Sequence, residues 1–70
     1  MKSAYELLMS CPTEQTKRCQ IVVNAISEGR WADAAFTLRN VEKEVEDGEW
    51  KNDVSVLAAH CENNAATCAA

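Results

Sequence analysis

The chain has 70 residues, a formal net charge of −4 and 47% hydrophobic residues, with only two glycines and one proline. A chain of this length forms one domain, residues 1–70, and this composition excludes the disordered and low-complexity classes of protein. No apolar run approaches the roughly 18 residues that a membrane span requires, and the N-terminal stretch MKSAYELLMSCP is too polar for a secretory signal. We therefore expect a soluble, cytoplasmic protein that does not interact with membranes.

The charge is distributed unevenly along the chain. Residues 1–39 carry five basic and four acidic side chains, whereas residues 40–70 carry two basic and seven acidic ones. Binding to nucleic acid depends on clustered lysines and arginines that face the phosphates. Because this acidic chain has no such cluster, we expect no direct contact with nucleic acid.

The first half of the chain predicts a short helix followed by a longer one. Residues 3–10, SAYELLMS, have Ser3 as a candidate cap and Glu6 at the spacing of a capping box. Pro12 then interrupts the pattern, and it fits the first turn of a second helix, where its missing N–H group is not needed. We expect this second helix to run from about residue 13 to residue 28.

Two similar stretches, EGRW at residues 28–31 and DGEW at residues 47–50, mark the later helix boundaries. In each stretch the glycine is expected to end one helix in a left-handed conformation, and the tryptophan begins the apolar stripe of the next helix. These boundaries predict a third helix that ends at Gly48 and a fourth that begins between residues 50 and 53. We expect the tail, residues 63–70, to fray.

The fold class that follows is all-α, a small bundle or open array of three main helices plus a short N-terminal helix. Apolar side chains recur at helical spacing along each of the main helices, and the third has the clearest stripe. Short connections place consecutive helices antiparallel to one another. The expected core residues are Val22, Ile26, Trp31, Leu38, Val41, Val45, Trp50 and Leu57.

The four cysteines, Cys11, Cys19, Cys61 and Cys68, are open to three interpretations. On apolar helical stripes a free cysteine behaves as a small hydrophobic residue, which is the interpretation that we favour. The even count and the Cys11-x7-Cys19 and Cys61-x6-Cys68 spacings also fit disulfides. A metal site would combine these cysteines with His60, but the short loops typical of such sites are missing.

Catalytic chemistry has little support in the sequence. His60 is the single histidine, and its neighbour Cys61 projects about 100° away around a helix, so the two do not face each other. No glycine-rich loop is present to bind a phosphate. We expect no enzymatic activity, no catalytic residue, no cofactor and no metal.

Acidic residues near the end of the third helix form the candidate partner-binding surface. Glu42, Glu46 and Glu49 recur at i, i+4 and i+7, and Glu44 and Asp47 flank this row. Acidic side chains at a helix C-terminus oppose the helix dipole, so their position is unfavourable for stability alone. The pattern is typical of a solvated face, and the functional alternative is a docking surface for a protein with a basic surface.

Phe36 suggests a further contact, because it lies opposite the apolar stripe of the third helix. Such a residue is covered either by the short first helix or by a partner, and we expect a homodimer with Phe36 in its interface.

By elimination, the predicted function is that of a non-enzymatic protein–protein interaction module, a small acidic regulator, inhibitor or adaptor. Proteins of this size and charge are common products of phages and other mobile elements, and by that association we expect such an origin. The alternative function is a cysteine-dependent redox or metal-binding helical module.

Overall fold

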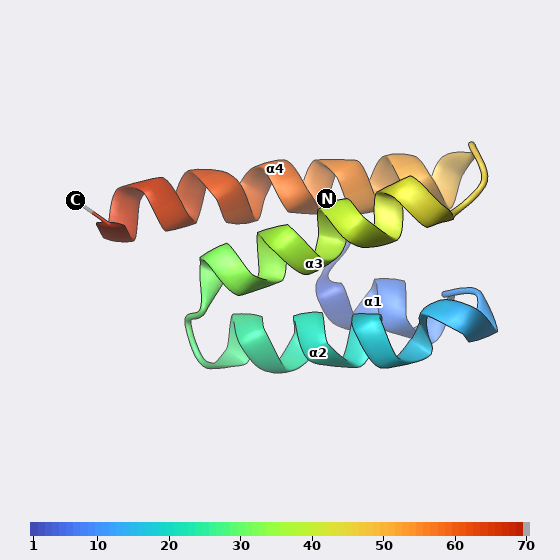
Figure 1. Cartoon of the computed structure of the whole chain (residues 1–70), viewed down its shortest axis with the longest axis horizontal. Coiled ribbons are helices and arrows are strands. Elements are labelled where there is room, and N and C mark those ends of the chain that lie inside the picture. Colours follow the sequence, from blue (N-terminus) through green and yellow to red (C-terminus); the bar gives the residue numbers. More distant parts are fainter. Residues whose placement is uncertain (70) are drawn as a thin grey trace.

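The computed structural model describes residues 1–69 and the side chains of residues 1–67. Its helices, shown in Figure 1, are α1 (Ala4–Met9), the 3₁₀ turn η1 (Thr13–Gln15), α2 (Thr16–Ser27), α3 (Trp31–Glu44) and α4 (Glu49–Ala69). No β-strand occurs within residues 1–69. The expected all-α class, with three main helices and a short N-terminal one, is confirmed.

In this bundle α3 lies between α2 and α4, and α1 packs against α2 and α4 (Figure 1). The Lys2 ammonium lies 3.4 Å from the Asp53 carboxylate, and the Trp50 indole N–H donates a hydrogen bond to the Leu7 carbonyl oxygen at 3.3 Å. These two contacts hold α1, which is too short to be stable alone, against the first turns of α4. Because α4 extends past the turn between α2 and α3, the molecule is elongated, 35 × 19 × 19 Å.

The start of α1 follows the expected capping box. The Glu6 N–H group donates to the Ser3 hydroxyl at 3.2 Å, and the Ser3 N–H group donates back to the Glu6 carboxylate at 3.1 Å. The start of α2 differs from the expectation, because Thr13–Gln15 form a 3₁₀ turn and the α-helix begins only at Thr16. In this tighter turn the Gln15 N–H group bonds to the Pro12 carbonyl oxygen at 2.9 Å, and the Gln15 side chain is buried.

The two glycine-containing stretches have different roles, which corrects the expectation that they are equivalent. Gly29 ends α2 as expected: its φ is 75°, and the following Arg30 N–H group donates to the Ala25 carbonyl oxygen at 2.8 Å. In contrast, α3 ends at Glu44, because Val45 adopts an extended backbone. Gly48 lies at the start of α4, where its carbonyl oxygen accepts the first helical hydrogen bond, from the Asn52 N–H group at 3.1 Å.

The early end of α3 has a physical reason. The segment that follows it contains several acidic residues, and negative charge is unfavourable at the C-terminus of a helix. Leaving the helix at Val45 keeps that apolar side chain half-buried against the core while the acidic side chains around it reach solvent. At the other end of the chain, α4 continues through residues 63–69, where we expected a frayed tail; residue 70 lies outside the described residues.

The core lies at the centre of the bundle and receives side chains from all four α-helices. Among the predicted core residues, Val22, Leu38, Val41 and Leu57 are buried, and Ile26, Trp31, Val45 and Trp50 are half-buried against them. Leu7 and Val54 also belong to the core, although the prediction did not include them. Alanines complete it: Ala25, Ala34 and Ala58 are fully buried, which lets neighbouring helices approach closely.

Leu38→Ala is expected to lower the free energy of unfolding by roughly 2–5 kcal/mol, because it empties a site at the centre of the core. The Leu38 side chain is 2% exposed. Unfolding in guanidinium chloride, followed by circular dichroism, measures the change. Val56→Ala, at a side chain that is 52% exposed on α4, is the control and should stay within about 0.5 kcal/mol of the parent. Equal midpoints for the two variants would show that the buried face of α3 is wrongly assigned.

Candidate functional site

The predicted acidic row does not exist as a row on one helix. Because α3 ends at Glu44, Glu42 lies on α3, Glu46 lies in the connection and Glu49 is the first residue of α4. The helical spacing on which the prediction depended is therefore absent. Glu46 and Glu49 are exposed, whereas Glu42 is half-buried and engaged within the protein.

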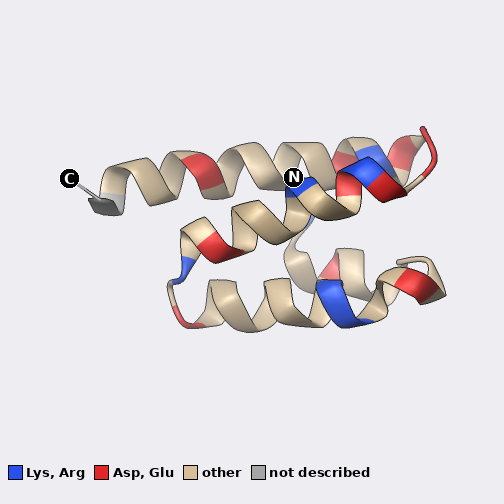
Figure 2. Cartoon of the chain, viewed as in Figure 1, with Lys and Arg blue, Asp and Glu red and all other residues tan. Residues whose placement is uncertain are grey.

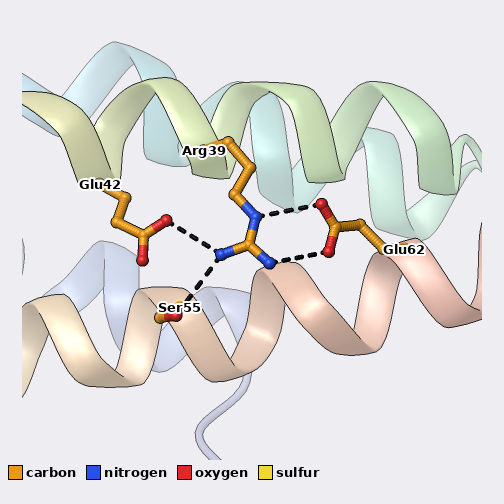
Figure 3. A network of polar contacts seen from close by, with 4 residues as sticks. All are labelled: Arg39, Glu42, Ser55 and Glu62. Carbon is orange, nitrogen blue, oxygen red and sulfur yellow. Dashed lines mark hydrogen bonds and ion pairs between the residues drawn. The ribbon is translucent and has the colours of Figure 1, made fainter.

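Glu42 belongs to a network that joins α3 to α4 around Arg39 (Figure 3). The Arg39 guanidinium donates two hydrogen bonds to the Glu62 carboxylate, at 2.7 and 3.0 Å, and one to Glu42 at 3.0 Å. It also lies 3.5 Å from the Ser55 hydroxyl of α4. Hydrogen bonds from Arg39 lower the pKa of both glutamates, and the same bonds raise the pKa of Arg39. Among residues 1–67, Glu42 is thus paired within the protein, unlike Glu46 and Glu49.

A cleft of about 610 Å³ lies at the end of the bundle where α2 and α4 begin and α3 ends. One wall is formed by η1 and the proline before it, and the other by the connection between α3 and α4. The lining residues are Pro12, Glu14, Gln15, Glu44, Val45, Glu46, Asp47, Gly48, Glu49, Trp50 and Lys51. We call this feature the acidic cleft, because five of these residues are acidic and one is basic. Figure 2 shows acidic positions gathered at this end of the bundle.

Two of the five carboxylates in the acidic cleft are neutralised within the protein. Glu44 forms an ion pair of 2.8 Å with Arg18 of α2, and Asp47 forms one of 2.9 Å with Lys51, whose hydrogen bond lowers the pKa of Asp47. The other three, Glu14, Glu46 and Glu49, have no cation within 4.0 Å among residues 1–67. All three are exposed, so the cleft presents unbalanced negative charge to solvent.

The acidic cleft also has an apolar part, made by Pro12, Val45 and Trp50. The hydrogen bond from the Trp50 indole to the Leu7 carbonyl oxygen fixes the orientation of the ring. Gln15, which also lines the cleft, is 4% exposed, and its side-chain oxygen accepts a hydrogen bond from Arg18 at 3.3 Å. Rigid apolar surface beside free carboxylates can bind a side chain that has an aliphatic stem and a cationic end.

Sequence reasoning found Glu44, Glu46, Asp47 and Glu49 but missed Glu14. Glu14 is some thirty residues away from the others in the chain, and it joins them because α2 and α3 are antiparallel. The signal that could have indicated it is Pro12, which marks a turn at the same end of the bundle.

Phe36, the predicted dimer residue, is 70% exposed on α3. The first helix does not cover it, because α1 packs against α2 and α4. Other exposed large apolar side chains are Met1, which precedes α1, and four on α1, α2 and α4, namely Tyr5, Met9, Ile21 and Val56.

The structure also shows where the cysteine and histidine side chains lie. Cys19 and Cys61 are buried free thiols and Cys11 is a half-buried one, while the side chain of Cys68 lies outside the described residues. His60 packs edge-on against Trp31, with ring centres 6.0 Å apart, and lies 3.0 Å from the Asn64 side chain. Within the described residues, no three side chains of histidine, cysteine, aspartate or glutamate are placed to hold a metal ion together.

Comparison with protein-family models, with curated proteins and with solved structures finds no match for this chain. Within the described residues, no helix has the length and apolar character needed to cross a bilayer.

Arg39→Met is expected to lower the melting temperature at neutral pH, because it removes the link between α3 and α4 but keeps much of the aliphatic stem. Ionised Glu42 and Glu62 stabilise the fold above their ordinary pKa of 4.5, and this contribution is lost as the pH falls through their lowered folded pKa. The difference between parent and variant should therefore shrink as the solution is acidified.

Thermal melts at a series of pH values measure this effect. Arg30→Met is the matched control, because the Arg30 side chain pairs only with residues within three positions, Glu28 and Asp33, and joins no separate helices. The control should melt close to the parent. A constant difference between parent and Arg39→Met down to strongly acidic pH would contradict the role of the two carboxylates.

Proposed function

We propose that this protein is a non-enzymatic interaction module whose acidic cleft binds a lysine- or arginine-rich segment of a protein partner. In this role it acts as a small acidic regulator, inhibitor or adaptor. The observation that carries the proposal is the set of three carboxylates, Glu14, Glu46 and Glu49, that surround the cleft without an internal cation.

The electrostatic argument favours a cationic ligand. Carboxylates gathered at one end of a small bundle repel one another. At physiological salt this repulsion has a range of about 8 Å, which is one screening length. A bound cation relieves this repulsion, and the field of the cleft accelerates the encounter with a basic segment and rejects acidic ones. Two further carboxylates, Glu44 and Asp47, already show this preference, since each holds a basic side chain of the protein itself.

The apolar part of the acidic cleft favours a peptide-like ligand over a bare ion. Pro12, Val45 and Trp50 offer surface against which the aliphatic stems of lysine or arginine can pack. The face of an indole ring also attracts a guanidinium group. The combination of free carboxylates with a fixed tryptophan supports a short basic segment as the ligand.

The cytoplasm is the compartment that we propose, because free thiols are typical of proteins in a reducing environment. We also propose homodimerisation as a second property, which the 70% exposure of Phe36 on α3 supports. A second copy would bury this ring against its symmetry mate, as in twofold interfaces where the same patch meets itself.

The triple variant Glu14→Gln/Glu46→Gln/Glu49→Gln is expected to bind a short fluorescent oligoarginine peptide roughly tenfold more weakly than the parent, because it removes the free carboxylates and keeps their shape. Fluorescence anisotropy at low and physiological salt measures the affinity. In a Trp31→Phe background, the emission of the remaining Trp50 should change on binding, since this ring lines the cleft.

The matched control makes the same change in net charge by adding positive charge away from the cleft. Ser27→Lys, Asn63→Lys and Ala66→Lys lie at exposed positions on α2 and α4, away from the cleft. This triple variant should retain most of the affinity for the peptide. If both triple variants lose affinity equally, net charge alone governs binding and the cleft is not the site.

Phe36→Glu is expected to convert a homodimer into a folded monomer, because a charge placed in the interface would be desolvated. Light scattering across micromolar concentrations measures the assembly state, and circular dichroism checks that the variant is folded. Val56→Glu, at another exposed apolar position, should remain dimeric. If the parent protein is monomeric at the highest concentration measured, the dimer proposal is wrong.

A further inference from the structure

Two free thiols lie at the connection between α1 and α2. Cys11 follows the last turn of α1 and is half-buried, and Cys19 lies in the first turns of α2 with 4% of its surface exposed. The residues between them include η1, which forms one wall of the acidic cleft. Nothing in the proposed docking function uses either thiol.

The geometry brings the two thiols to the same place. The Cys11 sulfur lies 3.7 Å from the Thr16 hydroxyl, at the first residue of α2. Thr16 and Cys19 are three residues apart in the chain, so their side chains are neighbours on one side of the helix. Cys11 therefore lies over the turn of α2 from which the Cys19 side chain projects.

The electrostatics of Cys19 agree with this placement. Burial raises the pKa of the Cys19 thiol to about 12, and the nearby Cys11 thiol contributes to the same shift. Cys19 is accordingly a neutral thiol at physiological pH, protected from solvent, with Cys11 as the accessible member of the pair.

We propose that Cys11 and Cys19 form a reversible disulfide by exchange with a small-molecule disulfide of the oxidised glutathione class. The Cys11 thiolate attacks one sulfur of the small disulfide, which forms a mixed disulfide and releases one small thiolate. The Cys19 sulfur then attacks the Cys11 sulfur and gives its proton to the departing small thiolate, which leaves as the second small thiol. Two protein thiols are oxidised, one disulfide of the co-reactant is reduced to two thiols, and no other oxidant is needed.

The new bond would close the segment from Cys11 to Cys19 into a loop. This loop contains Pro12, Glu14 and Gln15, which line the acidic cleft. Because the two side chains already lie near each other in the folded protein, the disulfide is expected to favour the folded state over the unfolded one. Oxidation would thus fix the wall of the cleft in its present position, whether or not the cleft binds a basic segment.

Incubation of the full chain with glutathione redox buffers, followed by intact-mass measurement and tryptic mapping, tests the proposal. Trypsin cleaves after Lys17 and Arg18, so Cys11 and Cys19 fall on separate peptides, residues 3–17 and 19–30, while Cys61 and Cys68 share a third. We expect the loss of two hydrogen masses and a linked pair of the first two peptides, both reversed by dithiothreitol. A Cys11 that stays glutathionylated, or that links to the third peptide, overturns the proposal.

Single variants test the order of the steps. Cys19→Ala should accumulate the mixed disulfide on Cys11, because no second thiol is present to release it. Cys11→Ser should leave Cys19 unmodified in the folded protein, because the Cys19 thiol is buried. Glutathione on Cys19 of that variant under native conditions would show that Cys19 is accessible and would overturn the assignment.

Comparison of native and denatured protein tests the role of the fold. The equilibrium constant for Cys11–Cys19 disulfide formation should be at least about tenfold larger in the native protein than in concentrated urea, and by linkage the oxidised form should melt at a higher temperature. Equal constants in the two solvents, or a lower melting temperature after oxidation, would mean that the fold does not bring the two thiols together.

Discussion

The close packing of α3 against both of its neighbours is the constraint on which the rest of the structure depends. Fully buried alanines on α2, α3 and α4 let the three helices approach one another. Once α3 is enclosed in this way, its remaining faces have fixed roles. Leu38 and Val41 fill the centre, Arg39 reaches Glu62 on α4, and Phe36 is left exposed to solvent.

The same packing creates the acidic cleft. Antiparallel neighbours place the start of α2, the end of α3 and the start of α4 at one end of the bundle. The positive end of the α4 dipole favours Glu49 in its first turn, whereas Glu14 and Glu46 have neither an internal cation nor the first turn of an α-helix to favour them. The unbalanced charge of the cleft is therefore only partly explained by the stability of the fold, and the remainder is what supports the proposed docking function.

The cysteines lie in different environments within the fold. Cys61 is fully buried and serves as a small apolar residue of the core, as the favoured interpretation of the sequence expected. Cys11 and Cys19 lie instead where a six-residue helix meets a longer one, and the half-buried sulfur of Cys11 lies over the buried one. The redox alternative drawn from their spacing thus has a specific location, beside the wall of the acidic cleft.

The sequence by itself determined the features that depend on a few neighbouring residues. The capping box of Ser3 and Glu6, the left-handed Gly29 and the apolar stripes of the main helices are of this kind, because backbone preferences and helical spacing act over one or two turns. Tertiary structure decided the rest. Gly48 begins a helix instead of ending one, because α3 already ends at Glu44 and Val45 packs against the core. Glu14 joins acidic residues some thirty positions away, because antiparallel packing brings distant segments together.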